Sequence, residues 1–417
     1  MRILKLSPYY FPEQVSSSHL TKDLTAAFIT NGITIENYVP TPTRGVTDEV
    51  RRKYKKIKYE EQEEGKIIIH RFSMFAEKKN NIQRAFRYIL VNFIQYIKGS
   101  HAKNIDLIYA GSTPPTQGML CGLVKKRLNV PFVYNLQDIF PDSLVNAKMT
   151  KKGSIIWKIG RRIENFTYRS ADKIIVISED FKRNIIKKGV PEDKIVVIPN
   201  WVNTNDVYPV ERKDNVLFDR YGFDRSKFYV CYSGNLGHSQ NLELLVKVAE
   251  EIQISMPNVF FVLFGEGIAK EELKAVVEKK KLDNIVILSF QPYEDIAHVF
   301  SFGDVGLIIS KSGIGKSSVP SKTWGIMAAE RPILASFDRN SELAEILIKT
   351  NSGIVTDTNS VESFVNAIRF LYENNDVRNE WGINGKNYVN KVVNKEICTK
   401  KYIDLVKECI ETKHGRI

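Results

Sequence analysis

The segment 310–337 follows a predicted strand and gathers lysine and serine residues ahead of an apolar helix. Ammonium groups placed there could stabilise the negative charge of a leaving diphosphate without a metal. A P-loop is excluded, because Ser310 stands where that motif requires a glycine. A capped helix with solvated lysines explains the same residues equally well. The candidates for binding a diphosphate are Lys311, Lys316, Pro320, Ser321 and Lys322.

A glycine-containing turn follows another predicted strand, in YSGNLGHSQNLELL (232–245). Gly234 and Gly237 would let the backbone approach a ligand closely, and Asn235 lies between them. N–H groups at the start of the following helix could then bind a diphosphate. Any αβ unit can carry such a turn, and the dinucleotide fingerprint GxGxxG is absent. These three residues are therefore candidate ligand contacts only in combination with other motifs.

A carboxylate occupies a similar position in the first half of the chain. Asp138 directly follows a strand with a buried pattern in YNLQDIFPDS (134–143), where a side chain is well placed for a site. A helix N-cap is the alternative role for this residue. None of the six histidines lies at metal-ligand spacing with another, so the sequence predicts no metal site. His19 and His238 are the two histidines expected in strand-to-helix loops.

These segments belong to two series of strands separated by helical stretches, which is the pattern of parallel α/β sheets. A non-repetitive stretch with a proline and several turn formers separates the series, and we place the hinge near 203–210. The sequence thus predicts two domains, 1–205 and 206–390. The predicted strands are 3–7, 33–39, 66–70, 105–110, 131–136, 173–178 and 194–199, then 227–235, 259–267, 284–290, 304–310 and 331–337.

The positive charge of the chain is confined to its first half. Residues 1–205 hold 34 Lys and Arg against 19 Asp and Glu, a net charge of +15, whereas the remainder has a net charge of −2. A basic surface suits nucleic acid, an anionic membrane or a polyphosphate ligand, and scattered solvated lysines are the alternative. The interleaved aromatic and basic residues of nucleic-acid-binding modules are missing, so we expect no nucleic-acid partner.

The apolar stretches of the chain are too short to cross a membrane. None approaches the ~20 apolar residues required, and the N-terminus lacks the apolar core of a signal peptide. The segment 84–103 is apolar in the middle with basic ends. It could lie in a lipid interface as a helix or form a buried core helix. The four cysteines form no CxxC pair, so a reducing cytoplasm is the simplest compartment.

The order of these motifs resembles that of family 4 retaining glycosyltransferases with the GT-B fold, over nearly the whole chain. The matching segments are SPYYFPEQVSSSHL (7–20), IPNWVNTNDVYP (198–209), YSGNLG (232–237), LFGEG (263–267) and VPSKTWGIMAAERPILAS (319–336). Within the family, NLQDIFPDS and VPSKTWGIMAA look most like the bacterial O-antigen and capsule branch that includes N-acetyl-L-fucosamine transferases.

The resemblance implies two facing Rossmann-like domains with parallel sheets, and a C-terminal helix in 391–417 that packs back on the first domain. It implies that the second domain holds a UDP-sugar donor and the first accepts an undecaprenyl-diphosphate-linked saccharide. The protein would then work without a metal or other cofactor, peripherally attached to the anionic inner face of the cell membrane. Ser17 and Glu266 join the donor-binding candidates by the same resemblance.

Several positions depart from the family pattern. The Gly-Gly of the first loop is Ser16-Ser17 here, and the phosphate-binding Arg and Lys align with Asn235 and Gln240. The paired glutamates of the family align with Ser317 and Gly325. We infer that a lysine of the segment 310–337 takes over the cationic role. The replacements are Lys322 together with Lys316 or Lys311.

The leading hypothesis is therefore retaining transfer of a sugar. Lys322 and backbone N–H groups after Gly234 would assist the departure of UDP, and Asp138 would orient the acceptor hydroxyl. A nucleotide-sugar epimerase or hydrolase of the same architecture is the second enzymatic reading. A non-catalytic partner subunit that binds sugar nucleotide or membrane is the third, because the family's glutamates and its Arg and Lys are missing.

Overall fold

The computed structural model of the chain describes residues 1–13, 18–77, 80–146, 149–315, 319–413 and 415. Its contacts divide the chain into two compact units. The first unit is Met1–Pro199 together with Thr399–Ile417, and the second unit is Asn200–Cys398. The division at residue 200 falls shortly before the predicted hinge near 203–210.

The first unit is built on an eight-stranded sheet. Its strands are β1 (Arg2–Leu6), β2 (Thr34–Pro40), β3 (Tyr59–Gln62), β4 (Ile67–Phe72), β5 (Leu107–Gly111), β6 (Phe132–Leu136), β7 (Lys173–Val176) and β8 (Ile195–Val197). Their order is β3-β4-β2-β1-β5-β6-β7-β8, and every neighbouring pair is parallel except β3 with β4. Apart from β3, these strands match the first predicted series.

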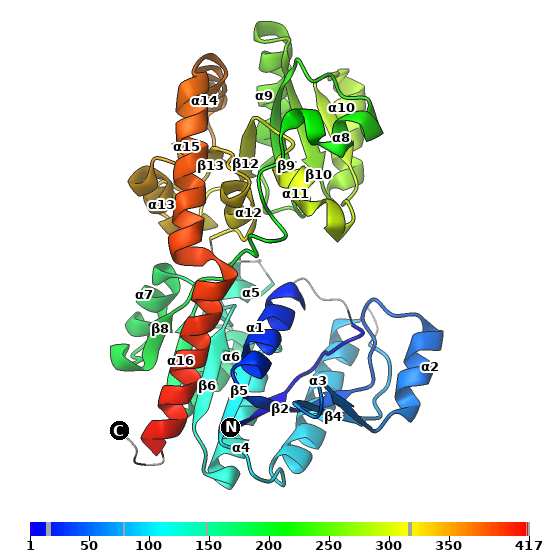
Figure 1. Cartoon of the computed structure of the whole chain (residues 1–417), viewed down its shortest axis with the longest axis vertical. Helices are drawn as coiled ribbons and strands as arrows, with labels where there is room; N and C mark the ends of the chain where they lie inside the picture. Colours follow the sequence, from blue (N-terminus) through cyan, green and yellow to red (C-terminus); the bar gives the residue numbers. More distant parts are fainter. Residues whose placement is uncertain (14–17, 78–79, 147–148, 316–318, 414, 416–417) are drawn as a thin grey trace. The chain divides into compact units, whose positions relative to one another are not determined.

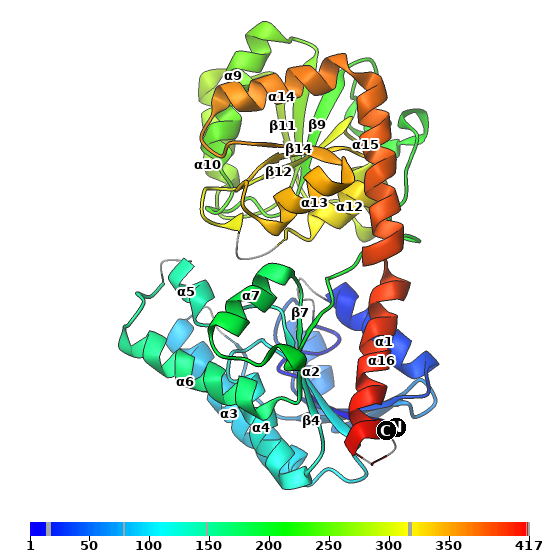
Figure 2. The same cartoon turned by 90° about the vertical axis from the view of Figure 1, so that its left-hand side faces the viewer.

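Helices cover both faces of this sheet (Figures 1 and 2). They are α1 (Ser18–Thr30), α2 (Asp48–Lys56), α3 (Asn81–Gly99), α4 (Gln117–Leu128), α5 (Asp142–Asn146), α6 (Ile155–Ser170), α7 (Glu179–Lys187) and the C-terminal α16 (Lys395–Lys413), with a 3₁₀ turn at Glu192–Lys194. Side chains of β5 point alternately to the two faces of the sheet. Ile108 and Ala110 lie on one face, in the core that contains residues of α4, α6 and α7. Tyr109 faces the other way, where its ring contacts Phe28 of α1 and Tyr402 of α16.

The second unit has a six-stranded sheet in which every pair is parallel. Its strands are β9 (Phe228–Ser233), β10 (Val259–Phe264), β11 (Ile285–Leu288), β12 (Val305–Ile309), β13 (Ile333–Ser336) and β14 (Gly353–Thr356), in the order β11-β10-β9-β12-β13-β14. The sequence predicted the first five. β14 was missed because its sequence GIVT contains only two aliphatic residues, too short an apolar run to be recognised as a strand.

Several helices of the second unit begin at a side chain that caps them. They are α8 (Val216–Tyr221), α9 (Leu242–Ser255), α10 (Lys270–Lys280), α11 (Ile296–Phe300), α12 (Lys322–Ala328), α13 (Glu342–Thr350), α14 (Val361–Glu373) and α15 (Asn375–Tyr388), with 3₁₀ turns at Arg212–Asp214 and Tyr293–Asp295 and a π-helical turn at Val389–Val393. Asn241, Ser341 and Ser360 each accept a hydrogen bond from a backbone N–H in the first turn of α9, α13 and α14. Such caps satisfy N–H groups that have no partner inside the helix.

Both units are therefore Rossmann-like α/β domains, which confirms the predicted fold class. In a parallel sheet the carboxyl ends of the strands lie at one edge, and the loops that follow them meet there. The predicted site residues that the structure describes lie in or after such loops. The four cysteines are free and buried.

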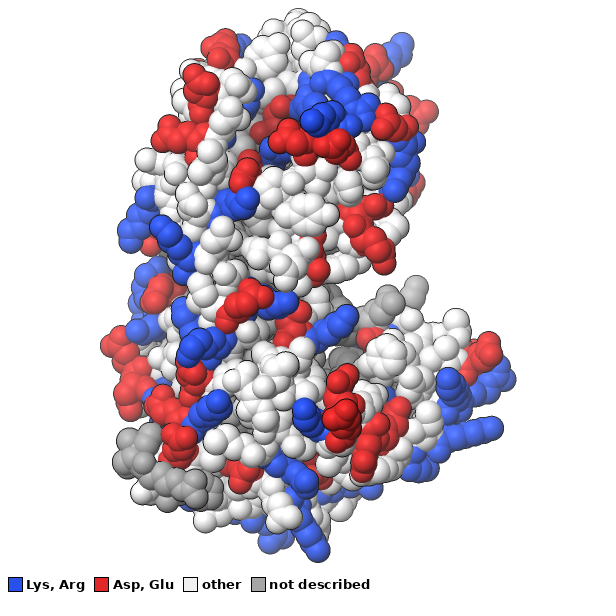
Figure 3. Space-filling model, in the orientation of Figure 1, with Lys and Arg blue, Asp and Glu red and all other residues white. Residues whose placement is uncertain are grey.

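The charged run 51–64 forms a surface excursion in the first unit. It contributes most of α2, which has no buried residue, and the antiparallel edge strand β3. Figure 3 shows Lys and Arg side chains gathered over α2. Charged side chains such as Glu60 and Glu61 at a sheet edge are unfavourable for pairing with another chain, which fits β3 as the last strand at this side.

The apolar segment predicted at 84–103 lies mostly in α3. One side of this helix is buried, as expected of a core helix, and the other is exposed, as expected of a helix at a lipid interface. Arg87, Val91 and Gln95 are buried at a spacing of four, whereas Phe93 and Ile97 are 60% and 46% exposed. One side of α3 thus packs against its own unit while the other presents apolar side chains to solvent. Within the described residues, no helix has the length and apolar character needed to span a bilayer.

Candidate functional site

Two loops meet at the carboxyl edge of the second unit's sheet, after the neighbouring strands β9 and β10. The N–H of Gly234 donates to the carbonyl of Phe264 (2.9 Å), and the N–H of Leu236 donates to the carbonyl of Glu266 (2.8 Å). A Cβ on Gly267 would lie 2.2 Å from the carbonyl oxygen of Leu236, so glycine is required for this close approach. The pair of loops contains the predicted residues Gly234, Asn235, Gly237 and Glu266.

Lys322 reaches these loops from the first residue of α12. Its Nζ lies 3.6 Å from the centroid of the Tyr232 ring. A Cβ on Gly234 would lie only 2.5 Å from the same Nζ, and Gly234 has a φ of +151°, which side chains rarely adopt. The structure thus brings Lys322 and Gly234, predicted from separate motifs, next to each other.

Lys322 is half-buried, and its ammonium group has no compensating carboxylate among the described residues. Burial lowers the pKa of Lys322 to about 7, and no neighbouring charge offsets this effect within the described part of the chain. The face of the Tyr232 ring attracts the cation, with an energy of roughly 1–2 kcal/mol. This is less than the cost of removing an ammonium ion from water. An anionic ligand beside Nζ would supply the missing counter-charge.

Three backbone N–H groups of the first loop already donate within the chain. Besides Gly234 and Leu236, the N–H of Gly237 donates to the side chain of Gln240 (2.9 Å). The following helix α9 begins at Leu242 and is capped by Asn241. A diphosphate that used these N–H groups, as predicted from the glycine turn, would have to displace existing hydrogen bonds. Lys322 is the better-prepared group for an anion.

The other predicted donor contacts have varied surroundings. Glu266 forms an ion pair with Lys270, whose Nζ lies 2.6 Å from the carboxylate and 3.0 Å from the hydroxyl of Ser289. The carbonyls of Pro320 and Ser321 accept hydrogen bonds from N–H groups in the first turn of α12, so these residues position Lys322. Lys311 is exposed, and Ser17 and Lys316 lie outside the described residues.

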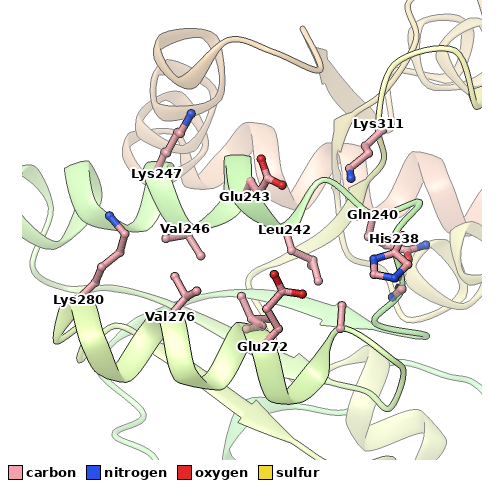
Figure 4. Close-up of a pocket in the computed structure, with 13 residues that line it drawn as sticks. His238, Gln240, Leu242, Glu243, Val246, Lys247, Glu272, Val276, Lys280 and Lys311 are labelled. Atoms are coloured by element: carbon pink, nitrogen blue, oxygen red, sulfur yellow. Dashed lines mark hydrogen bonds between the residues drawn. The ribbon is translucent and has the colours of Figure 1, made fainter.

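A hollow of about 350 Å³ lies beside the first loop, in the groove between α9 and α10 (Figure 4). Its walls include Leu242, Val246 and Val276, with His238, Gln240 and Lys311 at one end and Lys247 and Lys280 at the other. Of the predicted donor contacts among the described residues, Gly237 and Lys311 line it, whereas Gly234, Asn235 and Lys322 do not. The hollow is therefore adjacent to the Lys322 site and distinct from it.

Asp138 lies in the loop after β6, at the carboxyl edge of the first unit's sheet. Its N–H donates to the hydroxyl of Ser112 in the loop after β5 (3.2 Å), which joins the two loops. Asp138 is exposed in the first unit, but desolvation by nearby protein atoms raises the pKa of its carboxyl. Hydrogen bonds with the Ser143 side chain and the Ile139 backbone partly offset this increase. A carboxylate with a raised pKa accepts protons more readily. Because α5 begins only at Asp142, Asp138 is not its N-cap.

The two histidines singled out by sequence lie apart. His238 lines the hollow beside α9, whereas His19 belongs to the first turn of α1 in the other unit. Among the described residues, no three His, Cys, Asp or Glu side chains are grouped so that they could hold a metal ion.

Family models match both units of the chain. The model described as "Glycosyltransferase Family 4" matches residues 20–206, and the model described as "Glycosyl transferases group 1" matches residues 214–388. Together they extend over most of the sequence and meet where the two units divide.

Curated relatives and a solved structure agree with these matches. WbjE of Pseudomonas aeruginosa, named a probable glycosyltransferase, is 26% identical over 279 residues, which are 67% of this chain and 69% of WbjE. WcaI of Escherichia coli K12, named for colanic acid biosynthesis, is 24% identical over 290 residues, 68% of this chain and 69% of WcaI. The structure of HepE from Anabaena, a complex with UDP, superposes with a TM-score of 0.72 at 15% identity and covers 98% of this chain and 100% of HepE.

The two parallel-sheet units are those of the GT-B class of glycosyltransferases. The chain belongs to the family 4 glycosyltransferases, with the family 4 model in its first unit and the group 1 model in its second.

Sequence reasoning missed two residues that build the Lys322 site. Tyr232 forms the floor beneath the ammonium group, and Lys270 fixes Glu266. An aromatic residue at the end of a buried strand is normally read as core, which is why Tyr232 was overlooked. The available signal was its position two residues before Gly234, at the carboxyl end of β9.

We expect the substitution Lys322→Met to stabilise the ligand-free protein. Methionine keeps the side-chain volume and removes the buried charge, a change that typically adds about 1–4 kcal/mol. The gain should be largest below pH 7, where folded Lys322 is protonated, and should shrink towards pH 10, where the folded lysine is neutral. Thermal melting at several pH values measures this, with the exposed Lys279→Met as control. An unchanged or lower Tm at pH 6 would contradict a destabilising, unpaired ammonium group at this position.

Proposed function

We propose that the chain is a retaining glycosyltransferase that moves a sugar from a UDP-sugar to an undecaprenyl-diphosphate-linked saccharide. The second unit binds the donor and the first unit binds the acceptor. The pathway is the assembly of a bacterial surface polysaccharide, such as O-antigen or capsule. WcaI, named for colanic acid biosynthesis, and the UDP complex of HepE support this direction.

The observation that carries the proposal is the unpaired ammonium group of Lys322. It faces the loop at Gly234, where the chain leaves the sheet at its carboxyl edge. As the bond from sugar to diphosphate breaks, negative charge grows on the leaving oxygens. A cation held in a low-dielectric environment stabilises that charge more strongly than one in water. Lys322 thus fills the role of the family's missing Arg and Lys without requiring a metal.

Asp138 supports the acceptor half of the proposal. Its raised pKa suits a group that orients the attacking hydroxyl and accepts a hydrogen bond from it. The exposed carboxylate lies on a loop fixed by Ser112. N-acetyl-L-fucosamine is the donor sugar we would test first, on the resemblance of NLQDIFPDS and VPSKTWGIMAA to that branch.

A membrane-facing surface is also supported, by three adjacent helices of the first unit. α4 packs against both α3 and α6, and Figure 2 shows the three in one layer. Residues exposed by more than a third include Phe86, Ile89, Phe93 and Ile97 on α3, Leu123 on α4, and Ile155, Ile156 and Ile159 on α6. Exposed apolar side chains gathered in this way mark interaction surfaces.

The charge of the same three helices favours anionic lipid as the partner. α3, α4 and α6 hold ten Lys and Arg but only one acidic residue, Glu164, which is 5% exposed. Basic side chains flanking apolar ones combine attraction to lipid headgroups with insertion below them. We infer that the enzyme works peripherally at the inner face of the cell membrane, where its acceptor would lie.

Replacement of Lys322 tests the donor assignment. We expect Lys322→Met to lower kcat/KM for sugar transfer by roughly 10²–10³-fold, as loss of one charge-stabilising donor does elsewhere. UDP should bind the wild type more weakly as pH rises above about 7, because the free ammonium loses its proton, and the variant should lose this dependence. UDP-sugar assays with a polyprenyl-diphosphate acceptor, with and without EDTA, and calorimetry with UDP measure both.

The control for this experiment is Asp138→Asn, which should lower turnover and leave UDP affinity unchanged. Full activity of Lys322→Met would contradict the proposed role of Lys322 in the donor site. Turnover of UDP-sugar without a lipid acceptor, at the rate seen with it, would instead favour the epimerase or hydrolase. Absence of turnover by the purified chain with every UDP-, GDP- and dTDP-sugar tested would favour the partner subunit.

Vesicle sedimentation tests the membrane surface. The wild type should bind phosphatidylglycerol vesicles better than phosphatidylcholine vesicles, and less tightly at high salt. The double variant Phe93→Asn with Ile156→Asn should lose most of this binding, since both side chains are exposed by more than half. Ile348→Asn, at a residue 67% exposed in the second unit, is the matched control. Equal binding by all three proteins would refute this surface.

A further inference from the structure

An arginine cluster surrounds one carboxylate at the carboxyl edge of the first unit's sheet. Glu77 lies in the loop after β4, and Arg44 lies in the loop after β2. Arg84 and Arg87 follow in the first turns of α3. Arg44 Nη2 and Arg84 Nε are each 2.8 Å from the same oxygen of Glu77. Arg87 Nη1 is 3.9 Å from the other carboxylate oxygen.

The cluster carries more positive charge than its own carboxylate can neutralise. Three guanidinium groups against Glu77 leave a net charge of +2. Burial alone would raise the pKa of Glu77, but hydrogen bonds from Arg44 and Tyr9, together with the charges of Arg44 and Arg87, hold it below its ordinary value. Glu77 is therefore ionised and already fully engaged. A purely structural ion pair would need only one arginine.

Two further features leave the cluster under-compensated. Arg87 is completely buried, and its two terminal nitrogens have no hydrogen-bond acceptor among the described residues. Arg84 and Arg87 also lie near the N-terminus of α3, which has no acidic residue in its first turn. A helix N-terminus is the positive end of its dipole, so cations there are unfavourable by about 0.3–1 kcal/mol each. An anion would relieve both costs.

The cluster can be reached from solvent. The side chains of Arg44 and Arg84 are 37% and 38% exposed, so both can contact a ligand, while Arg87 contributes charge from beneath. The Arg44 guanidinium stacks on Tyr9, at 4.1 Å from the ring centroid. The Tyr9 hydroxyl in turn donates to Glu77 at 2.7 Å. Stacking and the bidentate ion pair fix the direction in which Arg44 points.

We propose that Arg44 and Arg84, backed by Arg87, bind the diphosphate of the lipid-linked acceptor. This inference rests on the proposed function for the nature of its ligand. A diphosphate esterified at both ends is a dianion, which would neutralise the excess charge of the cluster. Arg44 already donates from Nε and Nη2 to Glu77, so its Nη1 and the terminal nitrogens of Arg84 are the groups that would donate to phosphate oxygens. Two adjacent guanidinium groups suit two linked phosphates.

The position of the cluster agrees with both ends of such an acceptor. The apolar stripe on α3 begins at Phe86, between Arg84 and Arg87, and would place the lipid tail beside the membrane surface. Towards the other end, β2 and β6 are separated by three strand spacings, roughly 14 Å. Asp138, after β6, thus lies some way from Arg44, after β2. Sugar residues between the diphosphate and the reacting hydroxyl would fill that distance.

Calorimetry with soluble probes tests the cluster without any transfer reaction. Farnesyl diphosphate should bind the full chain more tightly than farnesyl monophosphate, inorganic pyrophosphate or inorganic phosphate. Arg84→Gln and Arg44→Gln should each weaken its binding at least 10-fold, with Arg84→Lys intermediate because lysine keeps the charge and loses the paired donors. Arg52→Gln on the exposed helix α2 is the matched control and should bind as the wild type.

Two readouts separate this inference from the proposed function. In activity assays, Arg84→Gln should raise the KM for the acceptor and leave the KM for the donor unchanged. Arg44 holds Glu77, so thermal melting must first show that Arg44→Gln folds. If it does not, the variant at the partly exposed Arg84 carries the test. Probe binding should persist in Lys322→Met, whose lesion lies in the other unit.

The outcomes are distinct. Wild-type affinity for farnesyl diphosphate in both glutamine variants would overturn the assignment. Equal binding of inorganic phosphate and farnesyl diphosphate would also overturn it, because the cluster would then be a general phosphate site. Arginine-dependent binding of farnesyl diphosphate by a chain that fails to bind any nucleotide would uphold the cluster and reject the proposed donor site.

Discussion

The chemistry assigned to this protein depends on a half-buried ammonium group that has no counter-charge among the described residues. Lys322 lies against the ring of Tyr232 and above Gly234, and burial holds its pKa at about 7. Such an arrangement costs stability, and proteins retain it where the charge acts on a ligand. The close packing of two glycine-containing loops and the short helix α12 exist, on this account, to hold one lysine in place. A leaving diphosphate restores the missing charge.

Positive charge without a matching carboxylate is also found at the carboxyl edge of the first unit's sheet. Arg44, Arg84 and Arg87 converge on a single glutamate and leave positive charge unmatched, whereas α3, α4 and α6 expose apolar and basic side chains. In both units the proposed functional groups lie in loops that follow parallel strands or in the first turns of the helices after them. The sheets themselves are ordinary cores of aliphatic and aromatic residues. What distinguishes the molecule is uncompensated positive charge at their carboxyl edges.

Much of the fold could be predicted from the sequence because its strands are runs of β-branched and aromatic residues. β3 and β14 could not, since β3 is polar and β14 contains only two aliphatic residues. The motifs also located Lys322 and Gly234, yet their proximity depends on how β9 and β12 pair within the sheet. The arginine cluster could not be predicted from the sequence, because its members follow β2 and β4 and come together only when these two strands pair. Residue spacing along the chain predicts helices and strands well, but it does not predict which distant residues come into contact in the folded protein.

The central claim is best tested by measuring the ionisation of Lys322 directly. NMR of the protein carrying isotope-labelled lysine, with the signal of Lys322 assigned by its absence in Lys322→Met, gives the pKa of this one ammonium group. We expect a pKa near 7 in the free protein and a clear increase when UDP binds, because the diphosphate stabilises the charged form. A pKa near 10.5 in the free protein that does not change with UDP would contradict the account.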